Sequence, residues 1–391
     1  AKFLLFTGDF VETGTEQNSE WEWEQWFEVS MKPLLSRMAL APTDGNHDDT
    51  PNLNYTYHFN TDKAFNETAT VKPQFDGITY SFVYGDALFM VYSHQDFWRG
   101  SYSYANGTST YLSNDVANWF RDQVEKYPDT KWRIAAVHKN LFTGSGHQAD
   151  EDGALFRATL LPVFQELNID FVIQGHDHIY EVMGPINNTT KTIVPGSVTN
   201  VELVSPDSNK NPKGQQGGTF NVKEGTLYFV NGTCGRKRYY PYTQDEMEAG
   251  FDKHKVEGYW DLFTGKYGQP GAPAFSEISV SSSEIEVKTY TSDANAQATL
   301  FDTFKIVKNG NTGIEENKQS AKLYPTYAKD KINTTESDII RVNAIDLTGK
   351  IYPLPFDNQH IDVSNLTDGI YVVQIFTNEK TRSERIVKTS R

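Results

Sequence analysis

The sequence of 391 residues is long enough for two or three domains, and it is 38% hydrophobic and 22% charged, the composition of a globular protein. It contains no apolar run near the roughly 18 residues of a membrane helix, and its single cysteine excludes an intrachain disulfide and a metal site built from cysteines. The formal net charge of -15 argues against nucleic acid as the main partner, because binding to a phosphate backbone needs clustered Lys and Arg.

The first half of the chain alternates predicted strands with predicted helices. Residues 3–6 are an unbroken run of Phe and Leu, typical of a parallel strand that is covered on both faces. Apolar residues recur at helical spacing from Ser19 to Met38, and Ser19 with Glu22 forms a capping-box pattern. The elements that follow are strands at 38–41, 79–84, 87–92, 132–137 and 170–173, and helices at 115–126 and 154–167. This alternation predicts a largely parallel sheet, whose function should lie at the loops that follow its strands.

The second half of the chain differs in composition and in its pattern of apolar residues. From Gly184 to Gly225 it is rich in Gly, Asn, Pro and Lys, which predicts a long surface excursion, and an apolar strand follows. Alternating segments between Phe275 and Lys308 predict antiparallel strands of a second sheet. Residues 309–319 are polar and turn-rich, as in a linker, and the short alternating strands beyond them predict a small all-β sandwich.

Four short loops after predicted strands contain side chains that bind metals. They are Gly8-Asp9, Gly45-Asn46-His47-Asp48, Val137-His138 and Gly175-His176-Asp177-His178. Each loop alone is weak evidence, because Gly-Asp and Gly-Asn are common in ordinary turns. Taken together and in this order, over roughly residues 1–308, they resemble the calcineurin-like metallophosphoesterase superfamily, and in particular its purple-acid-phosphatase-like branch.

This resemblance implies an α/β fold and a domain order. Residues 1–308 are expected to form a four-layer αββα sandwich of two mixed sheets, with residues 309–322 as a linker and residues 323–391 as a small all-β sandwich domain. The resemblance also implies a metal-dependent hydrolase of phosphoric esters that acts on a small phosphorylated substrate.

The resemblance further implies two metal ions, of Fe, Mn or Zn. Asp9 matches the carboxylate that bridges the ions. Asn46, His138 and His176 match the other ligands of one ion, and His178 matches a ligand of the second. Two ions about 3.5 to 4 Å apart lower the pKa of a bound water toward about 7, and the resulting hydroxide attacks phosphorus in line.

Three further residues are catalytic candidates. His47 matches the family's catalytic His, which stabilises the transition state or protonates the leaving oxygen. Asp48 is expected to orient His47 through its other ring nitrogen, as carboxylates commonly do. His147, on the loop after His138, is expected to face the substrate, with a solvated loop residue as the alternative. The basic residues 236–238 either meet a substrate's phosphate or leaving group or form a solvated loop.

Two departures from the family pattern affect these expectations. Purple acid phosphatases place a metal-binding Tyr three residues after the bridging Asp, where this chain has Glu12, so a colourless metal centre is expected. The family's D-x-H or D-x-G element does not precede Asp9 in this sequence. We therefore expect a longer natural chain whose upstream residues supply that element and a signal peptide, with a degraded metal site as the alternative.

From Leu323 onward the sequence resembles the C-terminal sorting domain of the type IX secretion system of Bacteroidetes. The resemblance rests on "LYPTYAKDKI", "DLTGK", "IDVSNLTDGIYVVQI" and a final "RIVK", although Thr326-Tyr327 stands where the family usually has N-P. It implies recognition by the type IX machinery and a secreted or outer-membrane surface location. A generic β-sandwich such as a carbohydrate-binding module is the alternative.

These observations predict a secreted phosphoesterase with two metal ions that hydrolyses phosphate monoesters by attack of a metal-bound hydroxide. Phosphodiesters and nucleotides stay open as substrates, because relatives share the metal loops and differ in the surrounding loops. The alternative from another class is a non-catalytic cell-surface or adhesion protein that retains the fold with an incomplete metal site.

Overall fold

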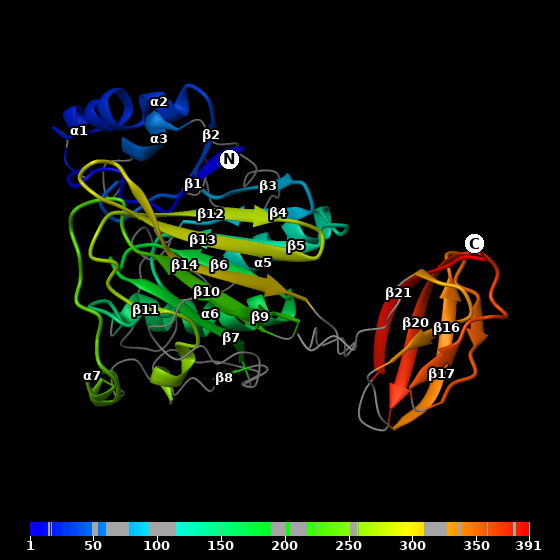
Figure 1. The fold of residues 1–391 in the computed structure, drawn as a ribbon. Coiled ribbons are helices and arrows are strands. Elements are labelled where there is room, and N and C mark those ends of the chain that lie inside the picture. The colour runs from blue at the N-terminus through cyan, green and yellow to red at the C-terminus, as the bar shows by residue number, and fades with distance from the viewer. Residues whose placement is uncertain are drawn as a thin grey trace. The chain divides into compact units, whose positions relative to one another are not determined.

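A computed structural model describes sixteen segments of the chain (Figure 1). They are residues 1–14, 16, 18–48, 54–59, 78–93, 115–148, 150–188, 201–203, 217–223, 225–250, 256, 258–308, 327–334, 338–357, 359–377 and 381–390. The chain divides into two compact units, residues 1–310 and 311–391. The predicted linker at 309–322 lies outside the described residues.

The first unit begins with a parallel strand pair around a helical segment. β1 (Phe3–Phe6) pairs in parallel with β2 (Ala39–Pro42). Between them lie α1 (Glu20–Glu24), a π-helical stretch (Gln25–Met31) and α2 (Lys32–Leu35), where the spacing predicted one helix.

The capping-box prediction at the start of this helical segment is wrong. Ser19 makes no side-chain capping bond, and its hydroxyl instead donates to the Gly14 carbonyl at 3.4 Å. The Glu22 carboxylate accepts from the Glu12 and Thr13 amides at 3.0 and 2.8 Å. Glu22 therefore holds the loop that follows β1 rather than the helix end.

The main sheet has eight strands in the order β11-β7-β10-β6-β5-β4-β3, with β8 beside β7. In chain order they are β3 (Tyr80–Tyr84), β4 (Ala87–Val91), β5 (Trp132–Val137), β6 (Phe171–Gln174), β7 (Tyr180–Asn188), β8 (Val201–Leu203), β10 (Thr226–Asn231) and β11 (Tyr267–Gly268). The strands β4, β5, β6 and β10 are parallel, and the flanking pairs are antiparallel. Strands β4 and β6 are buried along their whole length, as expected for parallel strands covered on both faces.

Two apolar cores lie on the two faces of this sheet. One core contains residues of α5 (Asp115–Lys126) and α6 (Glu151–Glu166), among them Trp119, Phe120 and Phe164. The other core joins the main sheet to a four-stranded sheet. That second sheet has the order β12-β13-β14-β9, formed by β9 (Thr219–Asn221), β12 (Ala274–Val280), β13 (Glu284–Ser292) and β14 (Ala298–Val307).

The α/β class and the two stacked sheets are confirmed, with one difference in the layers. The outward face of the four-stranded sheet carries ion pairs, such as Lys305 with Glu284 and Lys288 with Glu286. Charged side chains at alternate positions keep this face in water. Within the sixteen described segments no helix packs on it, so three of the four expected layers are present. The other short helices found in the described residues of this unit are α3 (Asn54–His58), α7 (Gln244–Ala249) and a 3₁₀ turn (Tyr259–Leu262).

The second unit is all-β, as predicted. A five-stranded sheet has the order β15-β21-β20-β17-β18, and β16 pairs with β19 in a second small sheet. These strands are β15 (Tyr327–Ala328), β16 (Lys331–Asn333), β17 (Ile339–Asp346), β18 (Ile351–Pro353), β19 (His360–Asp362), β20 (Gly369–Thr377) and β21 (Thr381–Lys388). Buried residues of both sheets, including Ile332, Val342 and Ile361, share one core.

In the part of the chain that the structure describes, no helix is long and apolar enough to cross a membrane.

An ion pair between the exposed Lys308 and the buried Asp170 connects the end of β14 to the start of β6 in the first unit. Lys308 Nζ lies 2.7 Å from Asp170 Oδ2, which also accepts from the Arg133 amide at 2.7 Å. The Lys308 ammonium lies 5.0 Å from the centre of the Trp132 ring. Burial raises the pKa of Asp170 to about 6, although Lys308 and the Arg133 amide oppose the rise.

Replacing Asp170 with Asn should change the pH dependence of stability in a defined direction. The folded-state pKa lies above the unfolded value of 3.8, so the folded protein binds more protons than the unfolded chain between about pH 4 and 6. The contribution of Asp170 to stability is complete at low pH and falls by ~3 kcal/mol as the pH rises through that window. The variant should therefore gain up to about that much stability relative to the wild type between pH 4 and 7.

Urea unfolding followed by tryptophan fluorescence measures this effect, because all seven tryptophans precede residue 310. Glu277→Gln, at an exposed carboxylate on β12, is the matched control. Parallel stability profiles of Asp170→Asn and the wild type across that pH range would contradict a raised pKa of Asp170 in the folded protein.

Candidate metal centre

Tight backbone packing brings the four predicted loops together beyond the ends of β1, β2, β5 and β6. Gly8 and Asp9 have left-handed backbones, with φ of 89° and 54°. A Cβ atom on Gly8 would lie 2.6 Å from His138 Nδ1, and one on Gly45 would lie 2.1 Å from the Asp9 nitrogen. Both positions therefore require glycine, because any side chain would separate the loops.

Three predicted ligands converge on the fourth, His138. Its Nε2 atom lies 3.2 Å from Asp9 Oδ2, 3.0 Å from Asn46 Oδ1 and 3.3 Å from His176 Nδ1. The ligand atoms of Asp9, His138 and His176 all lie within 4.8 Å of one another. One carboxylate, one amide oxygen and two imidazoles form a ligand set that suits Zn, Mn or Fe. The residues present therefore fit a bound metal ion.

Hydrogen bonds and neighbouring charges set the protonation of these ligands. His138 Nδ1 lies 2.6 Å from the Thr7 carbonyl, which can only accept, so Nδ1 carries the proton and Nε2 faces the other ligands. Burial opposes ionisation of Asp9, but His138 and His47 hold the pKa of its carboxyl below the usual range. Burial also lowers the pKa of His138, but Asp9 and the Thr7 carbonyl raise it further, so the net shift is upward. A bound cation would displace the proton at Nε2.

The expected contact between Asp48 and His47 is wrong. The buried Asp48 carboxylate accepts backbone hydrogen bonds from Asp9 and Gly45 through Oδ2, each at 2.8 Å, and from Phe10 and Val11 through Oδ1, at 2.7 and 3.3 Å. Burial and the Asp9 charge raise the pKa of Asp48, and these amide hydrogen bonds oppose the rise. Asp48 thus joins the β1 and β2 loops and fixes the backbone of the bridging candidate.

His47 is oriented by a backbone carbonyl instead. Its Nδ1 donates to the Glu12 carbonyl at 2.7 Å, and its own amide donates to Asp9 Oδ1 at 3.1 Å. Because the carbonyl fixes the Nδ1 proton, Nε2 is the nitrogen of His47 that can exchange a proton with a substrate.

His178 lies outside the group formed by Asp9, His138 and His176 in the described residues. Its ring stacks on Tyr239, with centroids 4.5 Å apart and an interplanar angle of 6°, and its Nδ1 donates to the Lys237 carbonyl at 3.0 Å. Burial lowers the pKa of His178, which favours the neutral form that a metal requires. Its assignment to a second ion stays a prediction.

His147 lies beside the ligand group rather than in a free loop. Its ring centroid is 3.9 Å from that of His176, and Nδ1 lies 2.7 Å from Asp150 Oδ2. The ligand atoms of His147, Asp150 and His176 also lie within 4.8 Å of one another. Burial lowers the pKa of His147, but Asp150 and Asp177 raise it, and the net shift is upward.

A buried acidic pair below His147 was not predicted. The Thr143 hydroxyl contacts Asp177 Oδ2 and lies 2.8 Å from Glu181 Oε1, while Glu181 Oε2 accepts from the Gly144 amide at 2.7 Å. Burial raises the pKa of Asp177 to about 6 and raises that of Glu181 well above its usual range. Since a hydroxyl donates one hydrogen, one of the two carboxyls must donate to it and is protonated. Asp177, the acidic residue inside Gly-His-Asp-His, was the sequence signal from which this pair could have been predicted.

The basic loop at residues 236–238 adjoins the site. Gln269 Nε2 donates to the carbonyls of His178 and Tyr239, at 2.7 and 2.9 Å, and so holds this loop against His178. Lys237 Nζ lies 3.9 Å from Glu12 Oε1. Both Lys237 and Glu12 are exposed, so this ion pair contributes little to stability.

Comparison with known proteins finds two family matches. Residues 1–180 match the family model of calcineurin-like phosphoesterases, and residues 322–389 match that of secretion system C-terminal sorting domains. An uncharacterized protein of Mycobacterium tuberculosis is 26% identical over 206 residues, 49% of this chain and 37% of that protein. Purple acid phosphatase 5 of Arabidopsis thaliana is 26% identical over 176 residues, 44% of this chain and 34% of that protein. The chain thus spans about a third of the length of these curated relatives.

A solved purple acid phosphatase from seeds of yellow lupin, Lupinus luteus, is 14% identical, with a TM-score of 0.49. The similarity covers 78% of this chain and 46% of the lupin chain. The sorting domain indicates type IX export to the cell surface or the medium. Residues 1–180 therefore belong to the calcineurin-like phosphoesterase family, and residues 322–389 form a secretion system C-terminal sorting domain.

Proposed function

We propose that this chain is an exported phosphoesterase that uses two metal ions to hydrolyse phosphate monoesters of small molecules. The observation that supports it most is the convergence of Asp9, Asn46 and His176 on His138 Nε2, from loops that follow four different strands. A buried structural cluster would not need two imidazole nitrogens and two oxygens directed at one point, whereas a cation does.

The metal ions, when bound, would supply a hydroxide near neutral pH and would neutralise the phosphoryl oxygens. Asp9, Asn46, His138 and His176 would hold one ion, and Asp9 with His178 would contribute to the other. In the net reaction the oxygen of water bonds to phosphorus, the ester P–O bond breaks, and the leaving oxygen takes up a proton.

The chain's own residues have two roles around the phosphate. His47 presents Nε2 because the Glu12 carbonyl holds Nδ1, and we assign to it the proton that the leaving oxygen receives. His147 stands beside His176 with its Nδ1 held by Asp150, and its positive form would contact a phosphoryl oxygen.

Elemental analysis and a hydrolysis assay of the natural full-length protein test this proposal together. We expect two metal ions per chain and release of phosphate from phenyl phosphate and glycerol phosphate. The activity should stop when a chelator removes the ions and return when Mn or Zn is added back. A protein without metal and without phosphate release would support the alternative, a non-catalytic surface protein with this fold.

A further inference from the structure

We propose that Glu181 is a positioning residue for His147, and that it acts through Thr143 and Asp177. This inference rests on the proposed function, because it concerns the phosphate contact that we assign to His147. Glu181 lies on β7 and is fully buried, whereas His147 is half-buried on the loop after β5. A chain of side-chain contacts joins the two residues.

Glu181 holds the backbone at the start of this loop. Its Oε2 accepts from the Gly144 amide at 2.7 Å. The Tyr259 hydroxyl accepts from the Thr143 amide and donates to the Thr143 carbonyl, each at 2.8 Å. The Gly144 carbonyl accepts from the Tyr267 hydroxyl at 2.7 Å. The backbone polar groups of these two loop residues therefore have fixed partners on β7, on the 3₁₀ turn and on β11.

Thr143 connects this anchored backbone to the imidazole of His147. The Thr143 hydroxyl lies between Glu181 Oε1, at 2.8 Å, and Asp177 Oδ2. The other oxygen of Asp177 lies 3.9 Å from His147 Nε2, and Asp150 Oδ2 lies 2.7 Å from Nδ1. The imidazole thus stands between a fully buried carboxyl and one that is 43% exposed. The buried carboxyl, which Thr143 and Glu181 fix, sets where the ring lies beside the ligand group.

Packing alone does not account for two carboxyls at this place. Asp177 and Glu181 have no exposed surface, and burying a carboxyl costs free energy that an apolar side chain would not cost. The next residues of β7, Val182 and Met183, supply apolar side chains to the two cores. A carboxyl at position 181 instead gives its contacts fixed directions, which a precisely placed imidazole requires.

A double-mutant cycle with His147 tests this role in the natural full-length protein. Glu181→Ala should raise KM for phenyl phosphate about tenfold with little change in kcat, because a displaced His147 weakens a phosphate contact that substrate and transition state share. His147→Ala should raise KM by about ten- to hundredfold, the range for one lost hydrogen bond to a charged group. In the His147→Ala background, Glu181→Ala should change KM by less than about twofold.

Two conservative variants keep the test decisive if Glu181→Ala fails to fold. Glu181→Gln presents an oxygen to the Gly144 amide and a donor to the Thr143 hydroxyl, so its KM should stay within about twofold of the wild-type value. Thr143→Val keeps the shape of the side chain but removes the hydroxyl that joins the two carboxyls. It should raise KM as Glu181→Ala does, and only while His147 is present.

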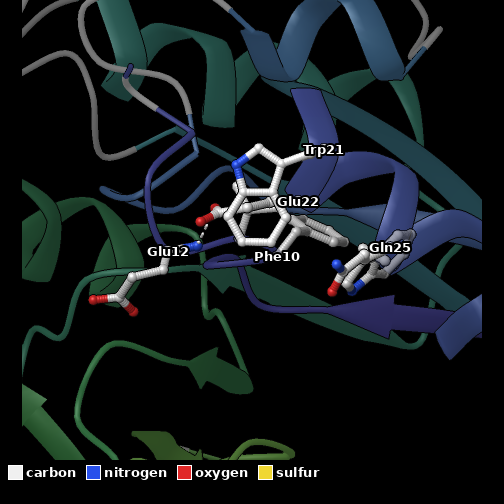
Figure 2. Close-up of a pocket in the computed structure, with 7 residues that line it drawn as sticks. Phe10, Glu12, Trp21, Glu22 and Gln25 are labelled. Carbon is white, nitrogen blue, oxygen red and sulfur yellow. Dashed lines mark hydrogen bonds between the residues drawn. The ribbon is translucent and has the colours of Figure 1, made fainter. Parts of the chain in front are cut away.

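Glu22→Ala is the matched control, because the Glu22 carboxylate also holds a loop that carries a site residue. Figure 2 shows a pocket beside the loop after β1, in which this carboxylate accepts from the Glu12 amide at 3.0 Å. The Glu12 carbonyl in turn holds His47. Because it acts through His47, Glu22→Ala should lower kcat/KM by the same factor in the wild type and in His147→Ala.

Equal effects of Glu181→Ala with and without His147, or a wild-type KM in Thr143→Val, would overturn the positioning role. Calorimetric titration with inorganic phosphate separates this result from a failure of the proposed function. A wild type that does not hydrolyse phenyl phosphate, but binds phosphate more tightly than Glu181→Ala by a margin that His147→Ala abolishes, would retain the positioning role and lose the phosphoesterase. A wild type that neither hydrolyses the ester nor binds phosphate would overturn both.

Discussion

Replacing His176 with Ala should lower kcat/KM for phosphate monoesters by at least about a hundredfold to a thousandfold, the range seen when one preorganised contact to developing charge is lost. His176 Nδ1 is 3.3 Å from His138 Nε2, and its removal leaves the proposed ion with three of four side-chain ligands. Elemental analysis should therefore show less than the wild-type metal content. His176 has a left-handed backbone, with a φ of 64°, so His176→Ala also changes a residue at a conformationally special position. Asn46→Ala avoids this and should give the same losses of metal content and activity.

His360→Ala is the matched control for the histidine substitution. His360 lies on β19 in the second unit, where its ring contacts Asp357. Its replacement should leave both metal content and activity unchanged. Circular dichroism should show that all three variants keep their secondary structure, and full activity in His176→Ala or Asn46→Ala would remove the proposed metal-dependent function.

Asp48→Ala should destabilise the first unit by on the order of 4 kcal/mol, because four buried or half-buried backbone amides lose the carboxylate that accepts from them. Activity should fall in parallel, since the Asp9 backbone is no longer held against Gly45. Urea unfolding monitored by tryptophan fluorescence measures the stability change.

Asp48→Asn separates the loss of charge from the loss of shape. Its amide oxygen can accept from one pair of backbone amides, while its NH₂ group faces the other pair and cannot accept. The Asn variant should therefore be intermediate between the wild type and Asp48→Ala. A loss of less than about 1 kcal/mol in Asp48→Ala would show that the amides find water or other acceptors.

The sequence was sufficient to predict which loops meet at His138, because strong local signals surround the proposed metal ligands. Apolar runs such as residues 3–6 and 132–137 predict strands. The structure buries most of β5 but leaves β1 only half-buried, so the predicted cover on both faces of β1 is wrong. The carboxyl ends of neighbouring parallel strands share one edge of the structure. The glycine beside each of Asp9 and Asn46 indicates a tight turn. The convergence of Asp9, Asn46 and His176 on His138 follows from that topology.

The roles of Asp48, Glu12 and Glu22 could not be predicted in the same way. Each depends on a backbone amide or carbonyl that a distant segment presents, and a sequence pattern records side chains rather than backbone groups. Glu22 matched a capping box three residues after Ser19, but its carboxylate instead accepts hydrogen bonds from the amides of Glu12 and Thr13. The contact of Glu22 with the loop after β1 thus replaces the capping interaction with Ser19.

The ion pair between Lys308 and Asp170 sets a limit on where the sorting domain can be cut away. Lys308 follows the last strand of the first unit, and its ammonium is the partner of a carboxylate that is almost completely buried. Cleavage before Lys308 would leave Asp170 without this cation in an apolar setting, which is costly. A maturation protease or a truncation that separates the first unit from the sorting domain should therefore cut beyond Lys308.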